Sequence, residues 1–570
     1  MRAVCRSLPR QPVISQLFFR NYQSSPFLAS SKLPTFFSPS PPIPSSPTAT
    51  HPQFHHTTPK MASSPDYQKA LSRLSALQSN LAITSLFSIP LPDNTDRNAA
   101  AIPEMLFWLS RAALSPETIA ASGLKCVHVA GTKGKGSVSA FVGSILAQYS
   151  DQEKVGVYTS PHLVDQRERI SLLSSGGDGV MIGEEKFGQY VNLVWDTMTE
   201  EARKQLGPDA KEEDLEGPGT KPFYFRFLTI VALRAFIEEG VKDAVIECGI
   251  GGEYDSTNIL PKESVTAAVV TQLGIDHVGM LGDTVEKITW HKAGIFKEGM
   301  KAFTIRHSKA TVGEVLRERA KEKGAELMEI SEEEVRAWKG VQGGRLQGPF
   351  QKGNMALAVY AAREHLIKTG HKFEGRFGVD GEGGLDDIPE EFVKGLKEAS
   401  LRGRCEVVRD GKDGMEWLVD GAHTEDSLVG VGDWFASRTV AARGTANRVR
   451  ILVFNQQERD PKILLTALLK GAGQKAAGSK EVFTHAFFTR NEELPPRMGE
   501  KRDLAVQTKA EETMKEYNSA VESKVCDNVS STIEEIRALA AKARAEGKEC
   551  HVLATGSFHL VGAVLRRINE

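Results

Sequence analysis

Short apolar runs alternate along the chain with amphipathic segments of helical spacing. The first run, Leu124–Ala130, predicts a buried strand, and a glycine-rich turn separates it from a predicted helix over Ser137–Tyr149. A predicted helix over Phe227–Gly240 leads into a predicted strand at Asp243–Cys248, and Val265–Leu273 predicts another strand. Strands that alternate with helices build a mostly parallel sheet with helices on its faces. We therefore predict an α/β fold.

The same alternation returns in the last third of the chain. We predict two α/β domains, over residues 61–398 and 405–570, joined by a hinge at 399–404. Two polar stretches, Glu200–Lys221 and Asn491–Asn528, are typical of surface insertions. The strands predicted for the second domain are Trp417–Asp420, Arg448–Phe454, Val482–Phe488 and His551–Thr555.

The composition excludes several classes of protein. The 570-residue chain is 40% hydrophobic and 25% charged, and no apolar run approaches the roughly 18–20 residues that span a bilayer. We therefore expect a globular protein without a membrane span. Beyond residue 60, acidic residues outnumber basic ones, which argues against nucleic-acid binding. Six cysteines without C-x-x-C spacing favour neither a zinc ribbon nor a disulfide framework.

Residues 1–60 differ from the rest of the chain. They hold six Lys or Arg, no acidic residue, ten serines and eleven of the 26 prolines. This composition is typical of a mitochondrial transit peptide followed by a Pro/Ser-rich spacer, although an unprocessed tail would share it. Met61 stands where a second translation start would remove the leader. We therefore expect a mitochondrial product, in the matrix or at the inner membrane, and a cytoplasmic product.

The strongest chemical signal is the glycine-rich segment Val129–Ser137 between the first strand and its helix. Glycines let backbone N–H groups face a phosphate, and the helix N-terminus adds partial positive charge. Lys135 could reach the β- and γ-phosphates of a nucleotide. The strict Walker A pattern is not met, because Val129 replaces its first glycine, Gly136 follows the lysine, and Ser137 comes one residue late. The alternative is a turn that binds no ligand.

Polar residues follow several predicted strands. Glu247 ends one strand, where a carboxylate suits Mg²⁺ or caps a loop. Asp276 and His277 follow the next strand, and Asp420–His423 follows a strand of the second domain. Carboxyl ends of parallel strands meet at one edge of a sheet, where ligands bind. This pattern predicts a site between the two domains, although a lone histidine is more often structural.

A polar loop adds further candidates. Ser160–His162 and Arg167–Arg169 could hold an anionic substrate, although charged surface loops are common. Lys292, judged by residue type alone, is an ordinary helix lysine. No Ser–His–Asp or Cys–His nucleophile is evident, and we therefore expect positioning and charge neutralisation to carry the chemistry.

Taken in order, these motifs resemble the folylpolyglutamate synthase family, the folate branch of the Mur-ligase superfamily. The resemblance covers roughly residues 65–565, and Asp66–Asn80 is similar to its eukaryotic, fungal-type members. It implies a large P-loop domain and a smaller Rossmann-like C-terminal domain with ATP between them. The segments that carry it are Gly131–Ser137, Thr159–Leu163, Gly249–Gly252, Leu281–Thr284, Lys292–Ile295 and Asp420–His423.

The resemblance also implies roles for individual residues. Lys292 matches a lysine that is carbamylated in the superfamily, which turns an ammonium into an anionic metal ligand. His423 is a candidate contact for an acyl phosphate or phosphate. The implied phosphate-cradling residues are Gly134, Lys135, Gly136 and Ser137, the nucleotide contacts are Asn354, Arg404 and Asp420, and the Mg²⁺ ligands are Ser160, Glu247 and His277.

Two residues depart from the family pattern. Lys133 stands where the family often has Asn, which adds a cation near the phosphates. Glu253 stands where the family often has Arg, and it removes a basic contact from the loop Gly252–Asn258. The role of that loop therefore stays open.

The implied reaction is ATP-dependent ligation of L-glutamate to the γ-carboxylate of a folate, through an acyl phosphate, with release of ADP and phosphate. ATP and Mg²⁺ would be the cofactors, with a monovalent cation as a further candidate, and we expect a monomer. A dihydrofolate synthase acting on dihydropteroate is the alternative with the same chemistry. A P-loop switch protein is the alternative from another class, but no N-K-x-D motif follows the P-loop domain.

Overall fold

The computed structural model describes residues 64–77, 98, 100–150, 154–174, 181–348, 350–374, 377, 384–410, 412, 415–440, 448–457, 459–476 and 480–569. The predicted leader over 1–60 and Met61 lie outside the described residues. Within these ranges no helix combines the length and the apolar character needed to cross a membrane.

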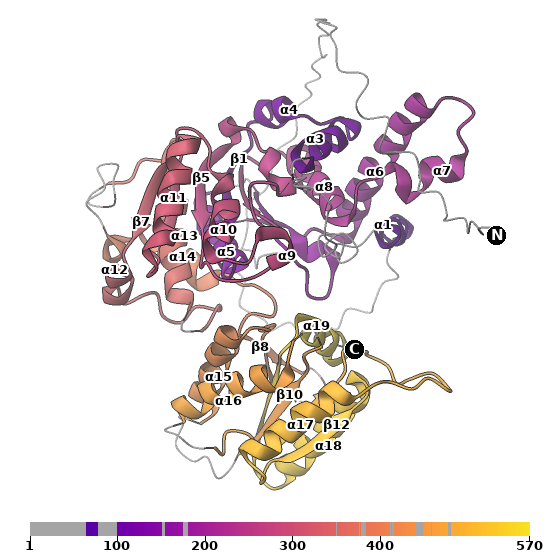
Figure 1. Cartoon of the computed structure of the whole chain (residues 1–570), viewed down its shortest axis with the longest axis vertical. Helices are drawn as coiled ribbons and strands as arrows, with labels where there is room; N and C mark the ends of the chain where they lie inside the picture. Colours follow the sequence, from indigo (N-terminus) through magenta and orange to yellow (C-terminus); the bar gives the residue numbers. More distant parts are fainter. Residues whose placement is uncertain are drawn as a thin grey trace, which may run out of the picture. The chain divides into compact units, whose positions relative to one another are not determined.

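The N-terminal domain is built on a seven-stranded sheet in the order β3-β2-β4-β1-β5-β6-β7. Figure 1 labels β1, β5 and β7 of this sheet. Every neighbouring pair is parallel except β2 and β3. The carboxyl ends of β1, β4 and β5 therefore meet at one edge of the sheet. The strands are β1 (Lys125–Ala130), β2 (Val155–Tyr158), β3 (Ile170–Leu173), β4 (Asp243–Glu247), β5 (Val265–Val270), β6 (Lys301–Ile305) and β7 (Glu326–Ile330).

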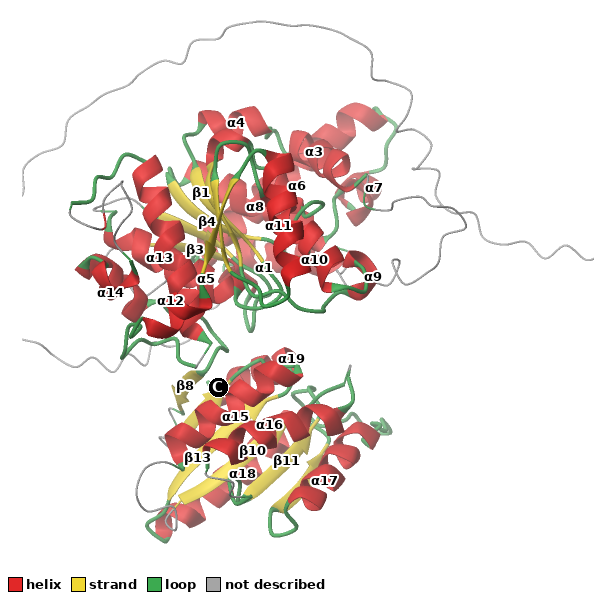
Figure 2. Cartoon of the chain, turned by 60° about the vertical axis from the view of Figure 1, so that its left-hand side comes forward, coloured by secondary structure: helices red, strands yellow, loops and turns green. Residues whose placement is uncertain are grey.

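Helices cover both faces of this sheet (Figure 2). Successive residues of a strand point to opposite faces, so β1 buries Cys126 and Ala130 in one core and Val127 and Val129 in the other. The helices are α1 (Pro65–Ala76), α3 (Ala101–Arg111), α4 (Pro116–Ala121), α5 (Lys135–Gln148), α6 (Glu184–Leu206), α7 (Glu212–Glu216), α8 (Tyr224–Glu238), α9 (Val278–Leu281), α10 (Val285–Lys292), α11 (Ala310–Lys323), α12 (Glu332–Ala337), α13 (Gln351–Lys368) and α14 (Glu390–Glu398).

The C-terminal domain holds a six-stranded sheet in the order β12-β11-β10-β13-β9-β8, parallel except for β8. Residues of α15, α16 and α17 join one core, and residues of α18 and α19 join the other. The strands are β8 (Glu406–Arg409), β9 (Glu416–Val419), β10 (Arg448–Phe454), β11 (His485–Thr489), β12 (Glu522–Cys526) and β13 (Glu549–Thr555), and the helices are α15 (Glu425–Thr439), α16 (Pro461–Lys475), α17 (Ala505–Tyr517), α18 (Val529–Ala545) and α19 (Phe558–Ile568).

The structure confirms the predicted α/β class and the predicted strands. It corrects the prediction that Asn491–Asn528 is a surface insertion, because this stretch contains α17 and the edge strand β12. Glu200–Lys221 is likewise more than a surface insertion, since Leu215 and Lys221 are buried. The chain passes from α14 to β8 through residues 399–405.

Candidate nucleotide and metal site

The glycine-rich loop joins β1 to α5 at the carboxyl edge of the sheet, as predicted. Gly134 has a φ of +87°, and a Cβ atom there would lie 2.5 Å from Asn354 Oδ1. A Cβ atom on Gly131 would overlap Thr271 Oγ1 at 1.8 Å. Both positions therefore need glycine. The loop places backbone N–H groups and the N-terminus of α5 at the strand edge, which suits a phosphate.

Two lysines converge on this loop. Lys135, at the start of α5, donates a hydrogen bond to the carbonyl oxygen of Gly131 at 3.2 Å. Lys292, at the end of α10, donates to the same oxygen at 2.7 Å. Burial, reinforced by the nearby charge of Lys135, lowers the pKa of Lys292 to about 7. Lys292 is thus a buried amine of the phosphate site, which its residue type alone did not reveal.

A buried carboxylate lies beside the same loop. Glu247 ends β4, pairs in register with Val129 of β1, and is 3% exposed. A Cβ atom on Gly136 would lie 3.6 Å from its Oε2 atom, and Ser160 donates its backbone N–H to that oxygen at 3.3 Å. Burial outweighs Lys135 and this hydrogen bond and raises the pKa of Glu247 to about 7. A cation is the partner that such a carboxylate lacks.

His277 lies at the neighbouring strand end, after β5. Its φ of +49° is in the left-handed region. The His277 side chain is 42% exposed, and partial desolvation together with the charges of Lys135 and Lys292 lowers its pKa. The histidine is therefore close to the two lysines of the phosphate loop. Among the residues that the structure describes, no three His, Cys, Asp or Glu side chains group as a metal site. Mg²⁺ fits this donor set because it keeps several waters and phosphate oxygens.

Asn354 and Ser137 belong to one buried network behind the loop. Asn354 Nδ2 donates to Gln351 Oε1 at 2.9 Å, and Gln351 Nε2 donates to Ser137 Oγ at 3.3 Å. Asn354 also packs its Oδ1 atom against Gly134. The network ties the N-terminus of α13 to the N-terminus of α5 and fixes the shape of the loop.

The C-terminal domain presents its polar residues at the end of β9. Asp420 accepts hydrogen bonds from the backbone N–H groups of Cys405 at 2.7 Å and Ala422 at 2.8 Å. Burial raises the pKa of Asp420 above its ordinary value. The guanidinium of Arg404 lies over the ring of Phe558, 4.9 Å from its centroid. Asp420 therefore holds the segment 399–405, which connects α14 to β8 and contains Arg404.

Contacts between the two domains bring these strand ends together. Lys133 forms an ion pair with Asp426 at 3.1 Å, and Arg459 lies 3.5 Å from Asp276. His423, whose Nδ1 lies 3.0 Å from the carbonyl oxygen of Gly421, contributes to the pKa of both Asp276 and His277. These contacts link the ends of β1 and β5 to residues that follow β9 and β10.

The two residues that depart from the family pattern, Lys133 and Glu253, have other partners in the structure. Glu253 hydrogen bonds to Arg319 and accepts from Lys323 at 3.0 Å, both on α11. Its backbone N–H donates to the carbonyl oxygen of His291 at 2.7 Å. Glu253 therefore fixes its loop to α11 and the end of α10. Lys133 is occupied by its ion pair with Asp426.

Sequence reasoning missed a buried network under the loop that follows β4. Asp255 accepts from the backbone N–H groups of Ile250 at 2.9 Å and Thr257 at 3.0 Å and from the Thr257 hydroxyl at 2.6 Å. Thr257 Oγ1 lies 2.8 Å from His128 Nε2, which lies 3.2 Å from Cys248 Sγ. The Asp-x-Thr spacing of a side-chain-capped turn was the signal available in the sequence.

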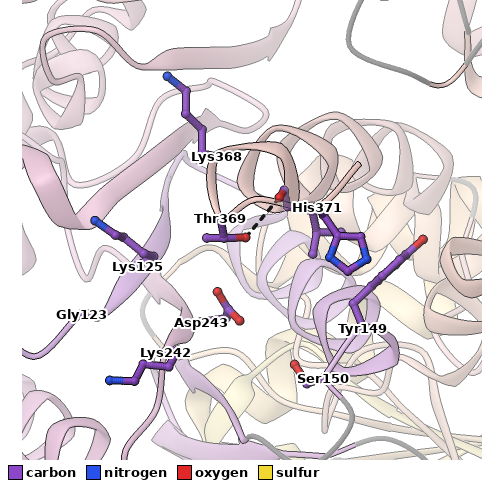
Figure 3. A pocket seen from close by; sticks show the side chains of 10 residues that line it. Gly123, Lys125, Tyr149, Ser150, Lys242, Asp243, Lys368, Thr369 and His371 are labelled. Atoms are coloured by element: carbon purple, nitrogen blue, oxygen red, sulfur yellow. Dashed lines mark hydrogen bonds between the residues drawn. The ribbon is translucent and has the colours of Figure 1, made fainter. Parts of the chain in front are cut away.

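A hollow of about 420 Å³ lies at the opposite, amino-terminal edge of the sheet (Figure 3). Three lysines line it, but each donates to a main-chain carbonyl oxygen. Lys125 bonds to Glu263 at 2.7 Å, Lys242 to Ser122 at 2.8 Å, and Lys368 to Gly299 at 3.4 Å. The main chain therefore engages one of the three N–H donors of each ammonium group.

Two parallel α/β domains with a glycine-rich loop at a strand edge are typical of nucleotide-binding α/β proteins. Comparison with known proteins is more specific. A folylpolyglutamate synthase of Saccharomyces cerevisiae is 36% identical over 511 residues, 88% of this chain and 86% of the relative. The chain therefore belongs to the folylpolyglutamate synthase family. The family model described as dihydrofolate synthetase, C-terminal domain, matches residues 404–567.

Solved structures agree with this fold. A Mycobacterium tuberculosis folylpolyglutamate synthase complexed with ADP superposes with a TM-score of 0.59 at 21% identity and covers 88% of this chain and 99% of that chain. An FPGS–AMPPCP–folate complex superposes with a TM-score of 0.54 at 19% identity and covers 88% of this chain and 98% of that chain.

Proposed function

We propose that the protein is an ATP-dependent ligase that adds L-glutamate to the γ-carboxylate of folates and their polyglutamates. The observation that carries the proposal is the convergence of Lys135, Lys292 and Glu247 on one glycine-rich loop. The yeast relative is named folylpolyglutamate synthase, and one structural neighbour is a complex with AMPPCP and folate. Both support ATP and a folate as the substrates of this chain.

The phosphate loop would hold the triphosphate of ATP. Backbone N–H groups of Gly134, Gly136 and Ser137 and the ammonium of Lys135 are the donors that a triphosphate needs. Ser160, Glu247 and His277 would hold Mg²⁺, and Glu247 fits this role because its buried carboxylate lies beside the loop. When bound, Mg²⁺ supplies positive charge that neutralises the phosphoryl oxygens.

The reaction has two steps, and positioning dominates both. The folate γ-carboxylate attacks the γ-phosphorus of ATP, the bond to the bridging oxygen breaks, and ADP leaves. The amine of L-glutamate then attacks the acyl phosphate carbonyl, loses a proton, and displaces phosphate as the amide forms. Lys135 would hold the transferring phosphoryl group in line with the acceptor carboxylate.

Residues of the second domain and of α13 would complete the site. Asn354 and Arg404 would contact the nucleotide. Asp420 would act by holding the segment 399–405, which contains Arg404. His423 would contact the acyl phosphate or the released phosphate. Its charge lowers the pKa of His277, which supports this placement. Closure of the two domains around the acyl phosphate would exclude water, which otherwise hydrolyses it.

Lys292 would be carbamylated. A neutral amine adds CO₂ and releases a proton, and burial lowers the pKa of Lys292 to about 7, which supplies that neutral amine. The carbamate would exchange a cation for an anion beside the candidate Mg²⁺ ligands. A free ammonium there would repel Mg²⁺.

The remaining assignments concern the whole chain. Residues 1–60 would direct a mitochondrial product, and translation from Met61 would yield the cytoplasmic one. Deleting residues 1–60 should abolish mitochondrial import and leave catalysis unchanged. We further propose that the enzyme acts as a monomer, with a monovalent cation as an additional cofactor.

The acyl-phosphate route has a direct test. A folate acceptor labelled with ¹⁸O in its γ-carboxylate should transfer one labelled oxygen to phosphate during turnover. Unlabelled phosphate would exclude this intermediate. A dihydrofolate synthase is the second candidate, because the matching C-terminal family model carries that description. Turnover with a folate acceptor would indicate the first function, and turnover with dihydropteroate alone would indicate the second.

A further inference from the structure

Helix α1 is docked tightly on α6. A Cβ atom on Gly188 would lie 3.0 Å from the backbone nitrogen of Tyr67 and 3.1 Å from the carbonyl carbon of Asp66. Asn192 donates to the carbonyl oxygen of Asp66 at 3.0 Å, and Arg73 donates to Asn192 at 2.9 Å. The two helices therefore touch along their backbones at Gly188, and α1 has little freedom to shift.

From α1, Tyr67 reaches the loop between β2 and β3. Its hydroxyl donates to both carboxylate oxygens of Asp165, at 3.2 and 3.3 Å. The guanidinium of Arg167 lies 5.4 Å from the centre of the Tyr67 ring. The ring also packs edge-on against Phe187 of α6. Tyr67 thus joins α1 and α6 to the loop by a hydrogen bond and a cation–π contact.

The carboxylates of Asp165 and Glu168 hold the loop. Asp165 accepts from the backbone N–H of Arg167 at 2.9 Å and from its side chain at 2.9 and 2.7 Å. Glu168 accepts from the backbone N–H groups of Leu163 at 2.7 Å and of Val164 and Asp165 at 3.0 Å each. Glu168 therefore fixes the backbone of residues 163–165, and Asp165 fixes Arg167 beside them.

The same loop begins at the candidate active site. Ser160 donates its backbone N–H to Glu247, and Arg169 Nε donates to His162 Nδ1 at 2.9 Å. Burial and the charge of Arg169 lower the pKa of His162 to about 4, which keeps its Nδ1 free to accept this bond. The loop 160–169 therefore starts beside Glu247 and ends at Arg169, a cation that suits the carboxylates of an acceptor.

We propose that Tyr67 of α1 is a positioning residue for the acceptor, because it fixes the loop 160–169 through Asp165. The inference rests on the proposed function, because it assigns this loop to the folate acceptor. The Tyr67 hydroxyl couples Tyr67 to Asp165, which lies 98 positions away in the sequence.

The first test compares Tyr67→Phe with Tyr190→Phe. Tyr190 is a matched control because it is also a buried tyrosine that donates to a carboxylate, Glu239, at 2.8 Å, but it lies away from the loop. We expect Tyr67→Phe to raise KM for tetrahydrofolate about fivefold, with kcat and KM for ATP changed less than twofold. Tyr190→Phe should change none of the three. Equal KM values in both variants would overturn the proposal.

A second pair of variants moves the helix without touching Tyr67. Gly188→Ala pushes α1 away from α6, whereas a Cβ atom on Gly183, at the start of α6, meets nothing within 4 Å. Gly188→Ala should raise KM for tetrahydrofolate in the same way, and Gly183→Ala should not. A purely structural role for α1 would lower the unfolding temperature of Gly188→Ala without changing KM, and that result would overturn the proposal.

Hydrogen exchange separates this inference from the proposed function. The backbone N–H group of Arg167, which donates to Asp165, should exchange at least tenfold faster in Tyr67→Phe than in wild type or Tyr190→Phe. If wild type shows no folate-dependent turnover, the proposed function fails, and exchange still decides whether Tyr67 holds the loop. If wild type turns over folate and exchange in Tyr67→Phe is unchanged, only this inference fails.

Discussion

Lys135 and Lys292 donate hydrogen bonds to the same acceptor, the carbonyl oxygen of Gly131, at 3.2 and 2.7 Å. Two ammonium groups on one oxygen repel each other, and Lys292 is also buried. Burial and the charge of Lys135 together lower the pKa of Lys292 to about 7. The glycine-rich loop therefore holds Lys292 as an amine that can lose its charge near neutral pH.

Lys292 is expected to carry a carbamate. Incubation with ¹³C-bicarbonate should give a carbamate resonance in the wild type that is absent from Lys292→Met. Lys287→Met is the control, because Lys287 is an exposed lysine of the same helix that pairs with Asp283. We expect Lys292→Met to lower kcat at least 100-fold, through loss of an anionic metal ligand. A resonance of equal intensity in Lys292→Met would place the carbamate on another amine and contradict the prediction.

Replacement of Lys135 should separate catalysis from folding. Lys135→Ala is expected to lower kcat/KM at least 100-fold, because the transferring phosphoryl group loses a positioned cation. Circular dichroism and the unfolding temperature should stay close to wild type. Lys133→Ala is the matched control in the same loop, since Lys133 is engaged by Asp426, and it should reduce activity less than threefold. Near-wild-type activity of Lys135→Ala would remove the loop from the mechanism.

Glu253 is predicted to contribute to stability rather than to substrate binding. It pairs with Arg319, whose side chain is 3% exposed, and Glu253→Gln would leave this buried cation with a weaker partner. We expect the free energy of unfolding to fall by about 1–3 kcal/mol. KM for ATP and for folate should change less than twofold. A large increase in either KM with unchanged stability would show that the loop acts on substrate.

The decrease in the free energy of unfolding at acidic pH should depend on Glu239. Burial acts to raise its pKa, but hydrogen bonds from Lys154, Lys186 and Tyr190 outweigh burial and lower it to about 2. A carboxyl whose folded pKa lies below its unfolded value stabilises the fold above the unfolded pKa of 4.5. That contribution is lost as the pH falls from 4.5 towards 2.

Glu239→Gln should therefore reduce the free energy of unfolding by about 1–2 kcal/mol at pH 7, and the difference should vanish near pH 2. Urea unfolding at several pH values measures it. Glu238→Gln is the control, because Glu238 is a more exposed neighbour paired with Arg234, and it should change the curve by less than about 0.5 kcal/mol. A constant difference across the pH range would contradict the assignment.

Much of the fold could be predicted because buried parallel strands are continuous apolar runs. Strand β10 was predicted with its observed bounds, Arg448–Phe454. The edge strand β12 was missed because it alternates exposed and partly buried residues from Glu522 onward, as Glu522-Ser523-Lys524-Val525-Cys526, and has polar flanks. An edge strand needs only one neighbour, so its sequence carries a weaker apolar signal.

The candidate site was predictable only in part, for a related reason. The phosphate loop is local, since Gly131 and Gly134 lie between an apolar strand and a helix. The partners of that loop are distant in sequence, as with Lys292, which bonds to Gly131 across 161 positions. The pairing of Tyr67 with Asp165 and of Glu253 with Arg319 likewise depends on packing that no local pattern expresses.

We expect this site to join L-glutamate to folate at the expense of ATP. The most direct test measures ADP release by the purified protein with Mg-ATP and L-glutamate, with tetrahydrofolate or dihydropteroate as acceptor. We predict turnover with tetrahydrofolate and a product heavier by one glutamyl residue. Turnover with dihydropteroate alone, or ADP release that does not require glutamate, would contradict the account.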